Sequence, residues 1–174
     1  EKRTTNIAEF ILYMWQLEDM IRERARTPEL EYIFKHELTR EAAYHSLLKK
    51  ERRAIHRLVA EALERLFPER IEEQLGLLAY HWEQSGDLER ATGYLLRAGD
   101  KARLAYAHQE ALDYYQRAQM MLEKVGGSAD ERWLAVAEGL GDVRAVIGEH
   151  EHALANYERA RDLADAVFEN RVRI

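Results

Sequence analysis

Residues 111–118 read ALDYYQRA, and residues 153–160 read ALANYERA. Both stretches have alanine at the first and last places and tyrosine at the fifth. A glycine stands twelve residues before each first alanine, at Gly99 and at Gly141. Glycine inside a helix costs about 1 kcal/mol relative to alanine, so two glycines at matching places need a reason in packing. The two stretches therefore predict repeated pairs of closely packed helices.

These spacings resemble the tetratricopeptide repeat, a helical hairpin of about 34 residues with small residues at its eighth, twentieth and twenty-seventh places and an aromatic residue at its twenty-fourth. With Thr92 and Leu134 as first residues, the repeat units cover residues 92–125 and 134–167. The repeat positions are then Gly99, Ala111, Tyr115, Ala118, Gly141, Ala153, Tyr157 and Ala160. A half-unit precedes them, with Ala91, Leu95 and Ala98 at the same spacing. The resemblance implies an all-α fold, a solenoid of antiparallel hairpins.

A steric argument explains the residue types at these positions. Only glycine or alanine lets two helix backbones approach closely, and an aromatic ring fills the space beside them. Stacked hairpins of this kind present a concave face that binds a protein segment.

Apolar residues recur at intervals of three and four along most of the chain, which predicts further helices. The predicted helices cover residues 49–66, 69–84, 88–104, 109–124, 132–147 and 151–168. In the first of these, Ile55 and Leu58 belong to the face expected to meet the core. Gly86 and Asp87 predict a helix end followed at once by the N-cap of the next helix. Connections this short require consecutive helices to be antiparallel.

The first 48 residues have a different pattern. Residues 5–19 predict a helix, residues 21–25 and 30–34 predict a pair of strands around the turn at Thr27-Pro28, and a further helix is expected to begin near Thr39. A helix, a β-hairpin and a helix are typical of the end of a winged-helix domain. We therefore predict two domains, a partial winged-helix element in residues 1–48 and a helical repeat array in residues 49–174.

The composition excludes several classes of protein. The chain of 174 residues is 47% hydrophobic and 33% charged, which suits a folded core with a charged surface and not a disordered chain. It has no cysteine, so disulfides and cysteine-held metal sites are excluded. The net charge of −6 disfavours nucleic acid or an anionic membrane as the main partner. No apolar run approaches the roughly 20 residues of a membrane-spanning helix, and we expect a cytoplasmic protein.

The N-terminal half carries a second resemblance. Residues 30–38 (LEYIFKHEL) and 41–44 (EAAY), together with Arg53 and His56, resemble the segment after the ATPase core in bacterial STAND (NB-ARC-like) signal-transduction ATPases. Such ATPases are often fused to class III adenylate or guanylate cyclases or to transcriptional regulators. The similarity covers roughly residues 15–125 and implies a winged-helix end followed by the start of a sensor array. Because the chain opens at Glu1 and closes inside a helical pattern, we expect it to be a fragment of a longer protein.

The resemblance singles out His36. Related NB-ARC proteins have a Met-His-Asp motif whose histidine senses the phosphates of the bound nucleotide, and His36 stands at the corresponding place, with Lys35 for the methionine and Glu37 for the aspartate. A structural role in capping the following helix is the alternative. The chain contains no Walker A pattern, so we expect no nucleotide and no other cofactor to bind this fragment itself.

Two further patterns have a functional and a simpler interpretation. His150 and His152 are two residues apart, whereas a histidine pair that binds metal on a helix needs a spacing near four, so we predict a solvated turn and no metal site. The basic run in residues 49–57 is either a nucleic-acid patch or the polar face of an amphipathic helix, and we favour the polar face.

The sequence as a whole predicts a non-catalytic protein-interaction and regulatory sensor scaffold and not an enzyme. The expected partner is a protein, a peptide or another domain of the same chain. The polar positions expected to line its groove are Arg97, Lys101, Glu138 and Arg144. Four aromatic residues are expected to make either partner contacts or packing contacts, Tyr94, Tyr106, Tyr114 and Trp133.

Two alternatives remain. The first is a structural or oligomerisation module that self-associates through an apolar C-terminal edge near Val167, Phe168 and Val172. The second is nucleic-acid binding through the basic helix of residues 49–57.

Overall fold

The computed structural model describes residues 21–25, 31–126 and 130–172. Its contacts divide the chain into two compact units, Glu1–Arg52 and Arg53–Ile174. The predicted domain boundary lies between residues 48 and 49, where a helix begins, and the observed division falls four residues later, inside that helix. The described part is predominantly helical, as predicted. No helix in these ranges is long and apolar enough to cross a membrane. The predicted helix of residues 5–19 and the Thr27-Pro28 turn lie outside the described residues.

The first unit contains the predicted β-hairpin. Strand β1 (Ile21–Ala25) pairs antiparallel with β2 (Glu31–Phe34), and the register shifts between Glu23 and Ala25. Helix α2 (Glu37–Ser46) follows directly and has no buried residue. It begins two residues before the expected start because the carbonyl of His36 accepts hydrogen bonds from the amides of Thr39 and Arg40, at 3.1 and 3.2 Å.

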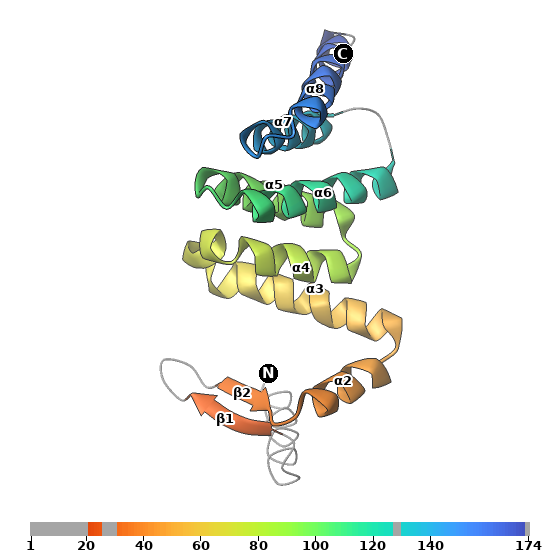
Figure 1. Ribbon diagram of the computed structural model, residues 1–174. Coiled ribbons are helices and arrows are strands. Elements are labelled where there is room, and N and C mark those ends of the chain that lie inside the picture. The colour runs from red at the N-terminus through yellow and green to blue at the C-terminus, as the bar shows by residue number, and fades with distance from the viewer. Residues whose placement is uncertain (1–20, 26–30, 127–129, 173–174) are drawn as a thin grey trace. The chain divides into compact units, whose positions relative to one another are not determined.

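The second unit is a succession of helices joined by short turns (Figure 1). It takes in α3 (Lys49–Leu66) from Arg53 onward, then the 3-10 helix η1 (Pro68–Glu73), α4 (Leu75–Ser85), α5 (Leu88–Leu104), α6 (His108–Val125), α7 (Glu131–Val146) and α8 (His150–Val172). Five of the six predicted helices appear with bounds within a few residues of the prediction. The exception is the helix predicted for residues 69–84.

That predicted helix is two elements and not one. The backbone leaves the helical region at Gln74, where φ is −113° and ψ is 16°. The amide of Gln74 donates to the carbonyl of Ile71 at 3.0 Å, a tight bond that ends the 3-10 turn. Because of the break, α4 starts anew at Leu75, whose side chain is almost fully buried.

Helix α3 faces its neighbour differently from the prediction. Ile55 and Leu58 were expected at the core, but they are 46% and 64% exposed. The buried residues of α3 are His56 and Ala60. Ala60 packs against α4 in a small cluster with Trp82, and an alanine at this point allows the large indole ring to lie against the helix.

The main core lies between α5, α6 and α7. Tyr115 of α6 is 1% exposed and lies at its centre. The buried side chains around it include Leu95, Ala111, Ala118, Met121, Leu122, Val136, Leu140 and Val143. Helix α8 buries Ala153 and Ala160, whereas its Leu154 and Phe168 are 60% and 69% exposed. One face of the last helix therefore has apolar side chains that no described residue covers.

The turns after α4 and α7 each contain a glycine in the left-handed backbone conformation. Gly86 ends α4 and Gly148 follows α7, both with φ of 86°. The side chain of Asp87 then accepts a hydrogen bond from the amide of Arg90 at 3.2 Å, so the predicted helix end and N-cap are confirmed. The corresponding turn after α5 has a different residue, Tyr106, and this difference leads to the candidate site.

Candidate functional site

A glycine and a tyrosine meet in each of the two repeat units. A Cβ on Gly99 would lie 2.9 Å from the ring of Tyr115, and a Cβ on Gly141 would lie 2.7 Å from the ring of Tyr157. Gly139 of α7 also lies against the Tyr115 ring and has no room for a Cβ either. The ring of Tyr115 is therefore held between the backbones of α5 and α7. Tyr157 has no further helix beyond it among the described residues and is 40% exposed.

Each tyrosine also makes the same hydrogen bond. The hydroxyl of Tyr115 donates to Asp100 at 2.7 Å, and the hydroxyl of Tyr157 donates to Asp142 at 2.9 Å. Burial and the neighbouring carboxylate raise the pKa of Tyr115 far above its ordinary value. The sequence analysis did not single out these two aspartates, although the repeated Gly-Asp dipeptide at residues 99–100 and 141–142 marks them.

Arg103 connects the two repeat units. Its guanidinium lies 3.6 Å from Asp100 of its own helix and 3.2 Å from Asp142 of α7. Its Nε also donates to the hydroxyl of Tyr115, at 3.4 Å. The positive charge of Arg103 is thus paired with two carboxylates, and the three groups together are negatively charged.

Beside this network lies a cavity of about 410 Å³ between the α5–α6 turn and the end of α7. Besides Arg103 and Asp142, its lining includes Leu104, Tyr106, Val146 and Tyr157. The apolar members are open to solvent, since Leu104 is 73% exposed, Tyr106 82% and Val146 65%. We call this the Tyr106 cavity. Its size is at the small end of the roughly 300–1,000 Å³ range of ligand pockets.

Tyr106 has an unusual backbone conformation. Its φ is 60°, in the left-handed region, and it is the one non-glycine residue with positive φ in the part of the chain that the structure describes. The amide after it closes the turn by donating to Ala102 at 2.9 Å, as the amide of Glu149 does to Arg144 after Gly148. A side chain in this conformation costs about 1–2 kcal/mol. Gly86 and Gly148 stand at the same place in the turns after α4 and α7, where positive φ has no steric cost. The strain therefore arises at Tyr106 because this turn has a tyrosine in place of glycine.

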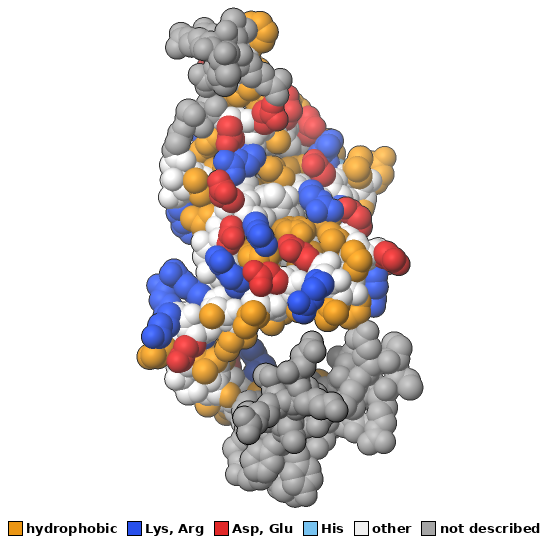
Figure 2. Space-filling view, turned by 180° about the vertical axis from the view of Figure 1, so that it is seen from behind, with side chains coloured by type: hydrophobic (Ala, Val, Ile, Leu, Met, Phe, Trp, Pro, Cys, Tyr) orange, Lys and Arg blue, Asp and Glu red, His pale blue; other side chains and the backbone are white. Residues whose placement is uncertain are grey.

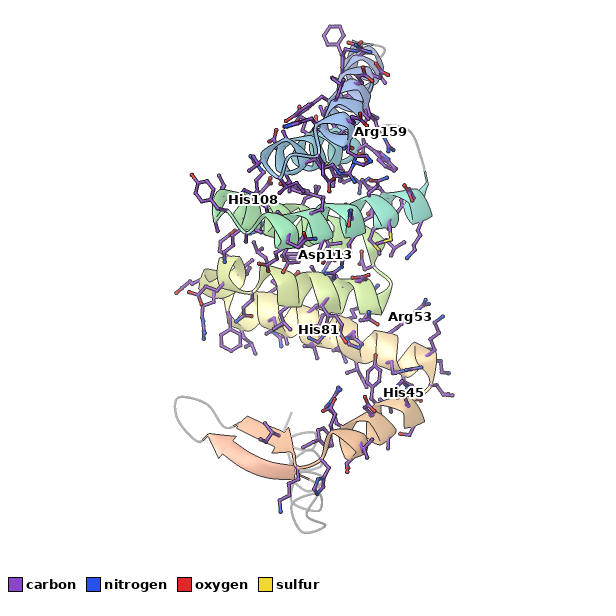
Figure 3. The ribbon with its side chains drawn as sticks, viewed as in Figure 1. His45, Arg53, His81, His108, Asp113 and Arg159 are labelled. Carbon is purple, nitrogen blue, oxygen red and sulfur yellow. The ribbon has the colours of Figure 1, made fainter. Side chains whose placement is uncertain are left out.

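His108, the first residue of α6, also lines the cavity, and Figure 3 places it next to the α5–α6 turn. Its ring meets that of Tyr106 edge-on, with centroids 6.1 Å apart. Its Nδ1 is buried and has no hydrogen-bond partner within the described ranges. A buried polar atom without a partner costs free energy, so a contact that satisfied this nitrogen would be favourable.

The four predicted groove residues lie on α5 and α7, and three of them have partners within the chain. The side chain of Arg97 pairs with the carboxylate of Glu72, and Lys101 donates to the backbone carbonyl of the same residue. Glu138 is exposed on α7. Arg144 was expected to point outward, and this is wrong: its side chain is only 22% exposed and lies 3.6 Å from Glu149, across the α7–α8 turn. The turn folds back over the end of α7 and covers it.

The other candidate aromatic residues have packing contacts. Tyr94 donates to Glu64 at 2.8 Å, and burial and that carboxylate raise its pKa to about 12. Trp133 lies under the guanidinium of Arg159, 4.9 Å from its ring centroid. Tyr114 donates to Glu110 at 3.2 Å.

His56 and His81 lie side by side, although no sequence spacing predicted that they would meet. His56 of α3 and His81 of α4 have their Nδ1 atoms 3.0 Å apart. His56 is 7% exposed, and the ring of Tyr80 meets it edge-on. Burial and the charge of His56 lower the pKa of His81. Their positions, 25 residues apart on different helices, gave no periodic signal in the sequence.

The remaining histidines and the basic run have simple surroundings. His36 is exposed and is the N-cap residue of α2; its carbonyl accepts the first hydrogen bonds of the helix, whereas its side chain makes no cap bond. Within the described ranges, no group of three or more His, Cys, Asp or Glu side chains could hold a metal ion, His150 and His152 included. In the basic run, Arg57 lies 3.7 Å from Asp87.

The fold and the cavity define a helical array with one β-hairpin and a solvent-open, largely apolar recess. The family model described as Domain of unknown function (DUF4924) matches residues 1–122, so the chain belongs to that family. No curated protein and no solved structure matches the chain.

Proposed function

We propose that the chain is a non-catalytic protein-interaction and regulatory sensor scaffold of the tetratricopeptide kind. The observation that carries the proposal is the twofold Gly–Tyr–Asp arrangement, in which a ring packs on a helix backbone and its hydroxyl bonds the aspartate after the glycine. Packing of this kind gives hairpins a fixed angle to one another and builds a rigid surface. A rigid surface with an open recess suits recognition of a partner segment.

The charged groups support recognition and not catalysis. Arg103 is paired with two carboxylates, and Arg97 and Lys101 are both engaged with Glu72. Figure 2 shows acidic and basic side chains interspersed over one face of the molecule, with apolar patches between them. Such a surface favours a protein or peptide partner, or another domain of the same chain, over a uniformly charged polymer.

The resemblance to STAND ATPases extends the proposal to a parent protein. In that reading the β-hairpin and α2 are part of a winged-helix element, and the helical unit is the start of a sensor array in a cytoplasmic signal-transduction ATPase. Partner binding to the array would shift an autoinhibited ATPase toward its open state. His36, exposed directly after β2, is free to face a nucleotide-binding domain in such a parent.

The experiment is a selection of short random peptides displayed on phage against the immobilised full chain, followed by calorimetric titration of the enriched peptides. The proposal expects saturable binding with one peptide per chain. Failure to enrich any peptide over an uncoated surface contradicts it. The double variant Arg97→Glu/Lys101→Glu is then titrated to learn whether the bound peptide also lies along the predicted groove.

The exposed face of α8 favours a second candidate, a module that self-associates. Leu154, Tyr157 and Phe168 are all exposed on this helix, which ends the described array. Apolar side chains in such a row are typical of a helix that packs against another. Light scattering of the wild type and of Leu154→Glu separates the candidates, because a dimer that dissociates in the variant supports assembly and a monomer throughout supports recognition.

A further inference from the structure

We infer that the Tyr106 cavity binds an uncharged, apolar side chain of a partner peptide and that Tyr106 is its anchor. The inference rests on the proposed function and deepens it, because it names the chemistry of the recognised segment. It depends on three separate observations, the balance of charge in the cavity, the backbone of Tyr106 and the unpartnered nitrogen of His108.

The charge balance selects an uncharged ligand. The guanidinium of Arg103 already lies within 3.2 Å of Asp142 and 3.6 Å of Asp100. An anionic ligand group would lose water and meet the net negative charge of Arg103, Asp100 and Asp142, which is unfavourable. A cationic group would compete with Arg103 for carboxylates that are already paired. The rest of the wall is formed largely by Leu104, Tyr106, Val143 and Val146. An apolar side chain gains free energy from these walls without breaking an ion pair.

The backbone of Tyr106 indicates that its side chain is retained for a contact outside the folded chain. At the same turn position the chain has Gly86 and Gly148, which adopt positive φ without steric cost. Tyr106 adopts it with a side chain that is 82% exposed, so burial within the chain does not compensate the strain. Strained backbone conformations cluster at sites that bind ligands or switch conformation. Tyrosine is also one of the residues most often found at the centre of protein interfaces.

The nitrogen of His108 supplies the polar contact. His108 lines the same cavity, and its Nδ1 is buried and has no partner within the described ranges. A peptide carries an amide N–H and a carbonyl beside every side chain, so it satisfies this nitrogen in either tautomer once the His108 ring turns toward the cavity. One apolar side chain and one main-chain hydrogen bond together fit a cavity of about 410 Å³.

The test uses the peptides enriched on the full chain in the phage selection. The inference expects enriched sequences to share an uncharged apolar residue at a fixed place. Replacing that residue by aspartate or lysine in the synthetic peptide should weaken binding at least about tenfold. Tyr106→Gly should weaken binding at least about tenfold, because it removes the anchor. Tyr106→Phe should bind within about threefold of the wild type, because the ring remains.

A matched pair of variants locates the peptide. Val146→Asp places a charge in the cavity wall and should abolish binding, whereas Val125→Asp, at the exposed end of α6, should leave the affinity unchanged. Circular dichroism of each variant confirms that it is folded. Enriched peptides whose common residue is charged, or peptides whose affinity is the same for Tyr106→Gly and the wild type, overturn the inference and leave the proposed function in place. If no peptide is enriched, both fail.

Discussion

The hydroxyl of Tyr115 donates a 2.7 Å hydrogen bond to Asp100, one residue after the glycine on which the Tyr115 ring packs. Tyr157 and Asp142 repeat this relationship at 2.9 Å. The two copies differ in burial, since Tyr115 is 1% exposed and Tyr157 is 40% exposed. The same bond is therefore made once by a buried ring and once by a half-exposed ring, which allows its contribution to be measured in both environments.

Tyr115→Phe should reduce the free energy of unfolding by about 1–2 kcal/mol, because it removes a part-buried hydrogen bond to a carboxylate. Tyr157→Phe should cost less than about 1 kcal/mol, because water replaces the lost partner at the exposed site. Urea denaturation followed by circular dichroism measures both. Equal losses in the two variants would show that burial does not set the strength of this bond.

Stability should fall on mild acidification because of the His56–His81 pair. The pKa of His81 is lowered from 6.5 in the folded chain, so the unfolded chain binds more protons as the pH falls below about 6.5. The contribution of His81 is fully present above that pH and is lost as the pH falls toward the folded pKa. Two protonated rings with nitrogens 3.0 Å apart would also repel each other.

The measurement is the urea midpoint at about pH 7.5 and about pH 5.5 for the wild type and for His81→Gln. The wild type should lose more stability between the two conditions than the variant does. A larger loss of stability in His81→Gln than in the wild type, or equal losses in both, contradicts a pH-dependent role of the His56–His81 pair.

Tyr106→Gly should raise the free energy of unfolding by about 1 kcal/mol, because glycine adopts the left-handed conformation without strain and the lost side chain is exposed. The gain is reduced by the greater freedom of glycine in the unfolded chain. Thermal denaturation of the two proteins checks it. A lower melting temperature for the variant would mean that the Tyr106 side chain stabilises the fold itself.

Much of the fold could be predicted because it depends on local signals. The bounds of α5 match the prediction, since Gly86 and Asp87 at its start are a helix end and a cap in any context. Gly99 and Tyr115 could be matched because both belong to one hairpin with a fixed spacing. The break at Gln74 was missed because the apolar spacing continues through it.

Contacts between hairpins could not be predicted in the same way. Gly139 meets Tyr115 across the α6–α7 boundary, and Arg103 meets Asp142 across the same boundary. These partners depend on how one hairpin lies on the next, which no period within a single repeat encodes. The side chain of Arg144 was placed outward for the same reason, because the turn that covers it is not part of the helix pattern.

The Tyr106 cavity was only partly visible in the sequence. Tyr106 was among the candidate aromatic residues, but nothing in the sequence gave its backbone conformation. An alignment of the turns after α4, α5 and α7 could have revealed it, because Tyr106 stands where the other two turns have Gly86 and Gly148. His108 gave no signal, because the burial of its nitrogen depends on the tertiary structure.

The packing of Tyr115 between two backbones is the central claim, and one comparison of two glycines in neighbouring helices tests it most directly. Gly139 has no room for a Cβ beside the Tyr115 ring, whereas a Cβ on Gly93 of α5 would meet nothing within 4 Å. Urea denaturation should show that Gly139→Ala lowers the free energy of unfolding by about 2 kcal/mol, since Gly99 keeps the ring from moving away. Gly93→Ala should raise the free energy of unfolding by about 0.5–1 kcal/mol. If the two variants were equally stable, the ring would not be held between α5 and α7, and the proposed scaffold would lose its basis.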